Sequence, residues 1–208
     1  MTICLGISGN IAAGKSTLTA LLSQKLGWEA FYEAVADNPY LADFYKDMRQ
    51  WSFHSQIFFL AHRARQHLNI VRQKQSVIQD RTIYEDSEVF ARNLYQQGLM
   101  DEHDYWSYRE LYEVLIDLLP PPDLIVYLRA SVLTLRRRLS LRDRRIEHEL
   151  SDEYLQKLND LYDEWASSFQ LCPVLTICAD EIDFVQGPDH LDRLAAEIRI
   201  ALAHAKAR

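Results

Sequence analysis

One short loop near the start of the chain constrains its fold more than any other feature. Residues 3–22 read ICLGISGNIAAGKSTLTALL, which is an apolar run, a glycine-bounded loop and then leucines at helical spacing. Gly9, Gly14, Lys15 and Ser16 fit the pattern G-x-x-x-x-G-K-[ST], placed after a predicted strand and before a predicted helix. Because the pattern occurs in this context, it predicts a phosphate-binding loop.

The chemistry of this loop suits a polyphosphate. Glycines let the backbone pass close to phosphate oxygens, and the N–H groups that open the following helix face the anion. Lys15 adds a full positive charge, and the Ser16 hydroxyl can hold magnesium. We therefore expect a nucleoside triphosphate to bind along the whole loop, through Gly9, Asn10, Ile11, Ala12, Ala13, Gly14, Lys15, Ser16 and Thr17.

Apolar runs that alternate with helix-like segments indicate the fold class. The β-rich runs occupy residues 2–8, 76–80, 123–128 and 173–178, with a weaker one at 28–33. Helical spacing follows the loop and recurs over 51–74, after the candidate N-cap Ser151, and after Pro188. Strands that are apolar throughout are buried on both faces. The sequence therefore predicts an α/β three-layer fold with a five-stranded parallel sheet.

Length bounds the domain organisation. A chain of 208 residues is enough for one well-buried domain, so we expect a single domain over residues 1–208. The three prolines at 120–122 are interpreted as a helix stop, because a buried-type strand follows them at once. No domain boundary is expected there.

Composition excludes several partners and sites. The net charge of −7 argues against a nucleic-acid partner, which needs a basic face. No apolar run approaches the roughly 20 residues that cross a bilayer, so we expect no membrane partner and a cytoplasmic location. Cys4, Cys172 and Cys178 suit no zinc pattern and are expected to be reduced and mostly buried.

Residues beyond the loop indicate what receives the phosphate. The chain lacks the Asn-Lys-x-Asp stretch that would specify guanine in a GTPase, and it is short for an ATPase motor. Gln56 and Arg63 lie two turns apart on one face of an aromatic-rich helical segment, suited to reading a base edge. Asp80, Arg81 and Asp86 follow a strand, at the edge where open α/β sheets bind ligands. A small kinase with an acceptor pocket is the interpretation that remains.

Several ordered motifs now carry a family resemblance. They are GNIAAGKST, the acidic Glu33 followed by NPYL, FYKDMRQWSFHSQIFFLAHR, QDRTIYEDSEVFA, the RxRxxE of Arg142, Arg144 and Glu147, and ADEIDF. Over nearly its whole length the chain resembles the deoxynucleoside kinase family, in particular its bacterial deoxyadenosine/deoxycytidine kinase members. The resemblance implies a P-loop kinase fold, ATP as donor, Mg²⁺, a deoxyribonucleoside acceptor and a homodimer.

The resemblance also implies catalytic roles. Glu33 matches the general base, which would accept the proton of the 5′-hydroxyl as its oxygen attacks the γ-phosphate. Arg81 matches the arginine that orients this base and the attacking oxygen. Asp80 matches the acidic residue near magnesium, beside Ser16.

Further matches concern the acceptor nucleoside. Tyr45 and Glu147 match the pair that binds the 3′-hydroxyl, and the tyrosine ring would crowd a 2′-hydroxyl. Gln56 matches the residue that hydrogen-bonds the base, and Arg63 with Asp86 matches a pair behind it. A buried ion pair with a purely structural role is the alternative for those two residues.

The arginine-rich stretch resembles the family's lid, over about residues 136–149. Arg142 and Arg144 match residues that reach the donor phosphates and the transferred group. Arg138 and Phe184 match the two sides of a sandwich around the donor adenine. A solvated basic helix face is the plainer interpretation of such a charge run.

Alternatives stay open at this point. Adenine and cytosine suit Gln56 and an anionic Asp86, yet guanine can also donate to a carboxylate, so a deoxyguanosine-preferring kinase is the first alternative. A thymidylate kinase-like enzyme would place an arginine where Tyr32 precedes Glu33. A non-catalytic nucleotide-binding regulator would not need all of these residues.

A homodimer face is expected on the helix around residues 105–115.

Overall fold

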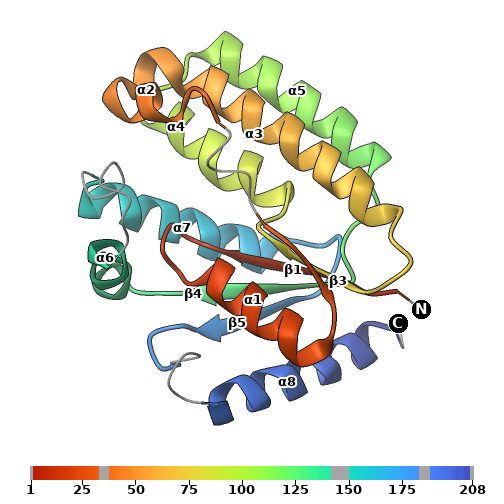
Figure 1. Cartoon of the computed structure of the whole chain (residues 1–208). Helices are drawn as coiled ribbons and strands as arrows, with labels where there is room; N and C mark the ends of the chain where they lie inside the picture. The colour runs from red at the N-terminus through yellow and green to blue at the C-terminus, as the bar shows by residue number, and fades with distance from the viewer. Residues whose placement is uncertain (1, 33–37, 142–149, 183–187, 207–208) are drawn as a thin grey trace.

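Five parallel strands form the centre of the molecule, with helices on both faces (Figure 1). The computed structural model describes residues 2–32, 38–141, 150–182 and 188–206. The strands lie in the order β2-β3-β1-β4-β5. They are β1 (Cys4–Gly9), β2 (Glu29–Phe31), β3 (Val77–Asp80), β4 (Leu124–Arg129) and β5 (Val174–Cys178). The predicted fold class is confirmed, and each predicted β-rich run contains a strand.

The inner strands are mostly apolar because both of their faces are covered. In β1, Leu5 and Ile7 are fully buried, and in β4 five consecutive residues from Leu124 to Leu128 are buried. The register pairs Ile7 with Asp80 on one side of β1 and Gly9 with Leu128 on the other. This pairing brings the loop after β1 beside the end of β3.

Two helices cover one face of the sheet and most of the others cover the opposite face (Figure 1). The first pair is α1 (Lys15–Leu26) and α8 (Pro188–Lys206). The opposite face carries α3 (Met48–Val71), the π-helix η2 (Asp86–Ala91), α4 (Arg92–Gln96), α5 (Glu102–Leu118) and α7 (Asp152–Ser168). The short helices α2 (Leu41–Lys46) and α6 (Val132–Ser140) lie toward the carboxyl ends of the strands.

Side chains at the helix ends explain where the helices begin. Ser151 caps α7 as predicted, because its Oγ accepts a hydrogen bond of 3.1 Å from the Tyr154 N–H. The helix expected over 51–74 starts earlier, at Met48, since the Asp47 carboxylate accepts from the Gln50 N–H, and it ends at Val71. The three prolines follow the end of α5 and lead into β4, as the helix-stop interpretation expected.

The cysteines are free thiols in three different environments. Cys4 and Cys172 are partly buried, and burial raises the pKa of each thiol to about 12. Cys178 is exposed, so the expectation of burial is wrong for this residue, which ends the edge strand β5. Within the described ranges, no helix is both long and apolar enough to cross a membrane.

Candidate active site

The predicted phosphate loop joins β1 to α1 in a conformation that needs its glycines. Gly9 has a φ of 146°, and a Cβ there would lie 2.7 Å from the Leu128 carbonyl oxygen. Gly14, at φ 102°, is the N-cap of α1 and has no side chain to occupy the first N–H groups of that helix. Lys15 is buried, and its Nζ donates to the carbonyls of Gly9 and Asn10, both at 2.8 Å. The backbone of the loop therefore holds the Lys15 ammonium group in place, where its positive charge can attract an anion.

Ser16 and Asp80 meet at the edge of this loop. The Ser16 hydroxyl donates to Oδ2 of Asp80 at 2.5 Å, a contact that the register of β1 with β3 allows. A hydroxyl and a carboxylate are the oxygen ligands that Mg²⁺ prefers, so this pair fits a magnesium ion that also binds phosphate. Elsewhere among the described residues, no cluster of three or more histidine, cysteine or acidic side chains forms a metal site.

Arg81 follows Asp80 in a strained conformation. Its φ of 68° lies in the left-handed region, which costs a non-glycine residue about 1–3 kcal/mol. The guanidinium lies 4.4 Å from the centroid of the Phe90 ring, and its Nη1 donates to the Tyr162 hydroxyl at 2.8 Å. Arg81 is nearly buried, so these contacts aim a fixed positive charge into the site.

Arg63 and Asp86 form a buried ion pair, as the sequence predicted. Nε of Arg63 donates to Oδ2 of Asp86, and both side chains are almost fully buried. Burial raises the pKa of the Asp86 carboxyl to about 6, although the Arg63 and Arg81 guanidinium groups oppose the shift. Asp86 opens η2, and such π-helical turns frequently occur at functional sites.

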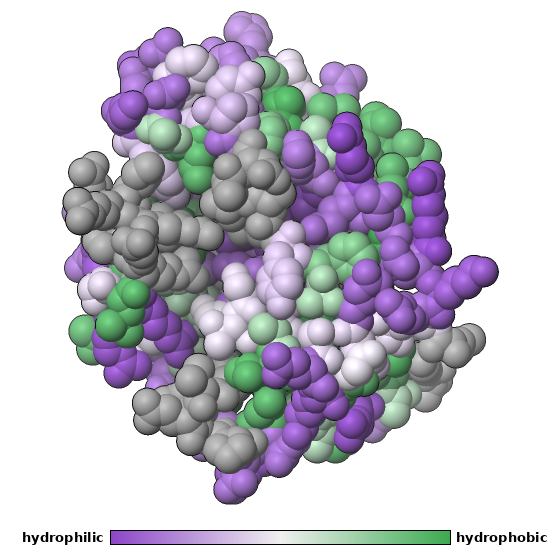
Figure 2. All heavy atoms as spheres, viewed as in Figure 1, coloured by the Kyte–Doolittle hydropathy of each residue, from purple (hydrophilic) through white to green (hydrophobic). Residues whose placement is uncertain are grey.

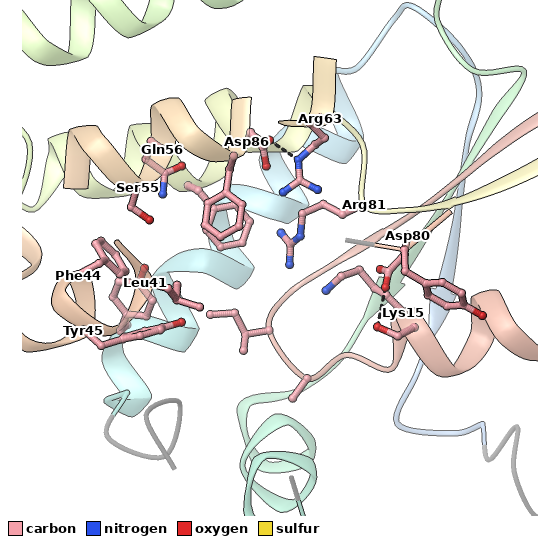
Figure 3. Close-up of a pocket in the computed structure, with 17 residues that line it drawn as sticks. Lys15, Leu41, Phe44, Tyr45, Ser55, Gln56, Arg63, Asp80, Arg81 and Asp86 are labelled. Carbon is pink, nitrogen blue, oxygen red and sulfur yellow. Dashed lines mark hydrogen bonds and ion pairs between the residues drawn. The ribbon is translucent and has the colours of Figure 1, made fainter. Parts of the chain in front are cut away.

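A cavity of about 310 Å³ connects these groups (Figure 3). Lys15, Asp80 and Arg81 lie at one end, Gln56 of α3 lies toward the other, and the Arg63–Asp86 pair is drawn between them, above Arg81 (Figure 3). Tyr45 of α2 lines the side, with its ring 5.2 Å from that of Phe44. The volume lies in the range of small-molecule sites, roughly 300–1,000 Å³. Eight polar or charged side chains of the predicted site therefore line one space: Lys15, Ser16, Tyr45, Gln56, Arg63, Asp80, Arg81 and Asp86.

Arg138 of α6 lies at the outer side of the phosphate loop. Its Nη1 donates to the Ala13 carbonyl at 2.6 Å and its Nη2 to the Ala179 carbonyl at 2.8 Å. The guanidinium thus joins the loop to the end of β5. The other predicted residues of the lid and donor site, and two of the acceptor site, lie outside the described residues: Arg142, Arg144, Phe184, Glu33 and Glu147.

Several residues that line the cavity carried no predicted role. They are mostly apolar or aromatic side chains that would enclose a flat ring, with one buried serine: Leu41, Phe44, Ser55, Phe90 and Tyr154. In the sequence they follow the same helical spacing as core residues. Only the packing of α2, α3, η2 and α7 around one space separates them from the core.

Comparisons with known proteins agree with this geometry. A family model described as "Deoxynucleoside kinase" matches residues 5–203. The deoxyadenosine/deoxycytidine kinase of Bacillus subtilis is 34% identical over 194 residues, which are 92% of this chain and 89% of the relative. The deoxyguanosine kinase of the same organism is 36% identical over 203 residues, 94% of this chain and 95% of the relative.

Solved structures are similar over the same extent. The deoxyadenosine kinase from M. mycoides with the products dCMP and a flexible dCDP bound superposes with a TM-score of 0.85 at 31% identity. The match covers 95% of this chain and 99% of that chain. The same enzyme with bound dATP superposes with a TM-score of 0.84, at the same identity and coverage.

Proposed function

The chain belongs to the deoxynucleoside kinase family, and on that premise we propose that it transfers the γ-phosphoryl group of ATP to the 5′-hydroxyl of deoxyadenosine and deoxycytidine. The observation that carries the base preference is the buried Arg63–Asp86 pair, which lines the same cavity as Gln56. The product would be a deoxynucleoside monophosphate formed by salvage of a free nucleoside.

The phosphate loop holds the donor in this proposal. The first N–H groups of α1 and the Lys15 ammonium face the ATP phosphates. Ser16 and Asp80 hold Mg²⁺, which neutralises phosphate charge when bound. Arg138, which already contacts the loop, lies against the adenine, with Phe184 opposite.

Phosphoryl transfer depends on groups at the end of the cavity where Lys15 and Arg81 lie. Glu33 accepts the 5′-hydroxyl proton, and Arg81 orients both Glu33 and the attacking oxygen. Lys15 stabilises the charge that develops on the transferred group, together with Arg142 and Arg144. The fixed position of Arg81, aimed into the cavity, supports this assignment.

Other residues of the cavity select the nucleoside. Tyr45 and Glu147 bind the 3′-hydroxyl, and the half-buried Tyr45 ring leaves little room for a 2′-hydroxyl. Adenine and cytosine both present an exocyclic amine beside a ring acceptor. The Asp86 carboxylate accepts from that amine, and the Gln56 amide both donates and accepts. Arg63 keeps Asp86 ionised and in place.

A panel of acceptors tests the proposal. Purified protein with MgATP is offered deoxyadenosine, deoxycytidine, deoxyguanosine, thymidine and thymidylate, and monophosphate or diphosphate formation is measured. We expect the highest kcat/KM for deoxyadenosine and deoxycytidine. Highest activity with deoxyguanosine would replace the base preference, and activity with thymidylate alone would favour a nucleotide kinase. ATP binding without any turnover would indicate a regulator.

The chain is also proposed to form a homodimer. Leu111, Val114 and Leu118 are exposed on α5 at spacings of three and four residues, so they form one apolar stripe. Trp106 of the same helix is also exposed. Large apolar side chains in a row on one helix are typical of a buried contact between subunits.

A further inference from the structure

Glu85 is a buried carboxylate next to the site, and nothing in the transfer proposed above uses it. It precedes Asp86 in the sequence, and its side chain is fully buried. Oε1 accepts from the Ser8 hydroxyl and the Thr82 N–H, both at 2.8 Å. Oε2 accepts from the Tyr162 hydroxyl at 2.6 Å and from the Gly9 N–H at 3.4 Å. Glu85 therefore contacts the start of the phosphate loop, the turn after Arg81 and helix α7.

The hydroxyl of Tyr162 joins Glu85 to Arg81. It donates its one hydrogen to Glu85 and accepts from Nη1 of Arg81 at 2.8 Å. The same Nη1 lies 3.7 Å from Oε2 of Glu85, so the two charges also attract each other directly. Tyr162 is fully buried, which keeps water out of this chain of hydrogen bonds.

The cost of burying a charge restricts how the groups around Glu85 can be arranged. An ionised carboxylate without solvent contact is stable only when hydrogen bonds and an opposite charge compensate it. Glu85 has four donors and one guanidinium, and these come from β1, from the turn after β3 and from α7. Moving any one of them would remove part of this compensation. Glu85 thus links the position of the phosphate loop to that of Arg81.

We propose that Glu85 is a positioning residue, which acts through Tyr162 to hold Arg81 and the phosphate loop at the separation that phosphoryl transfer needs. The inference rests on the proposed function, in which Arg81 orients the attacking oxygen. Glu85 does not line the described cavity, so it acts on the substrates only through these neighbours.

Two variants test the role. Glu85→Gln turns an amide NH₂ toward neighbours that are themselves donors. We expect kcat about 10 to 100 times lower, because small misplacements of reacting groups have effects of that size, with the KM for nucleoside within about threefold. Tyr162→Phe removes the hydroxyl that bonds both Glu85 and Arg81, and it leaves Ser8, Gly9 and Thr82 bonded to Glu85, so we expect kcat about tenfold lower.

Tyr127→Phe is the matched control. The Tyr127 ring stacks on Tyr162 with centroids 5.6 Å apart, and its hydroxyl donates to Asp163 of α7 at 2.9 Å. It contacts neither Arg81 nor Glu85 through these bonds. The variant loses a partly buried hydrogen bond from a tyrosine hydroxyl to a carboxylate, so its melting temperature should also fall, while kcat stays within about twofold because Arg81 is undisturbed.

The outcomes separate the two proposals. Equal kcat in Tyr162→Phe and Tyr127→Phe, or an unchanged kcat in folded Glu85→Gln, would overturn the positioning role while the proposed function stands. A change confined to KM would overturn it as well. If Glu85→Gln does not fold by circular dichroism, Tyr162→Phe against Tyr127→Phe decides. A wild-type protein without nucleoside turnover would refute the proposed function and this inference together.

Discussion

The charge of a single carboxyl, Asp86, would link the proposed base site to pH. Its pKa is raised to about 6 by burial, and it faces the Arg63 and Arg81 guanidinium groups and the neighbouring Glu85. An acid with a raised pKa in the folded chain stabilises folding most at low pH, below its ordinary value of 3.8, and this contribution is lost as pH rises through about 6. The ionised carboxylate that the proposed contact with the base needs is therefore held at some cost in stability.

The prediction at this scale rests on the ionised form of Asp86 accepting a hydrogen bond from the base. As pH falls from 7.5 to 5.5, Asp86 takes up a proton, and we expect the KM for deoxyadenosine to rise. Asp86→Asn should raise this KM by about tenfold or more at pH 7.5, the value of a lost hydrogen bond to a charged group. The variant's KM should also change less with pH. Parallel pH profiles for wild type and variant would assign the dependence to another group.

Helix α3 is the longest of the described helices, with 24 residues, and its middle and its C-terminal end have different roles. Its middle carries Gln56 and Arg63 in the cavity, and near its end His67 lies buried against the segment between α5 and β4. Nε2 of His67 is 2.7 Å from the Pro120 carbonyl oxygen. Because a carbonyl only accepts, this nitrogen carries the hydrogen. Burial lowers the pKa of His67, so the neutral ring is the stable form.

The element-scale prediction concerns this contact. His67→Leu leaves the Pro120 carbonyl without its donor and should lower the free energy of unfolding by about 1–3 kcal/mol at pH 7.5. A base with a lowered pKa contributes stability above its ordinary value of 6.5, and that stability is lost as pH falls below it. Urea denaturation at pH 7.5 and 5.5 should therefore show a smaller pH dependence in the variant. Its kcat at pH 7.5 should be unchanged, since His67 does not line the cavity.

At the scale of the whole molecule, helix α5 exposes a group of large apolar side chains. Figure 2 shows hydrophobic side chains gathered at the upper right, in the region where Figure 1 draws α5. The exposed apolar residues of that helix are Trp106, Leu111, Val114 and Leu118. A second copy packed against this surface, as proposed above, would bury these side chains.

The prediction at this scale concerns the mass of the particle in solution. Sedimentation should give twice the 24.3 kDa of one chain for the wild type. Val114→Lys places a charge in the stripe and should give the monomer. Ile200→Lys changes an equally exposed residue of α8, on the opposite face, and should stay dimeric. A monomeric wild type, or a dimer that survives Val114→Lys, would contradict the proposed interface.

The sequence by itself determined the features that depend on neighbouring residues. The glycine and lysine spacing predicted the phosphate loop, and continuous apolar runs predicted the buried strands, because both patterns act over a few positions. The motifs also named Gln56, Arg63, Arg81 and Asp86 before their common cavity was visible. Periodicity did not separate Phe44 or Phe90 from the core, since a wall of a cavity and a core position have the same spacing.

Only the tertiary structure decided which distant side chains meet. Ser8 and Glu85 are 77 positions apart, as are Glu85 and Tyr162, and no local pattern relates them. The sequence predicted Cys178 to be buried from its apolar run, but its place on an edge strand exposes it. Burial and hydrogen bonding depend on which segments pack together, and that is a property of the folded chain. The sequence motifs therefore predict the residues of the site. Which buried groups contact those residues and hold them in place depends on the tertiary structure.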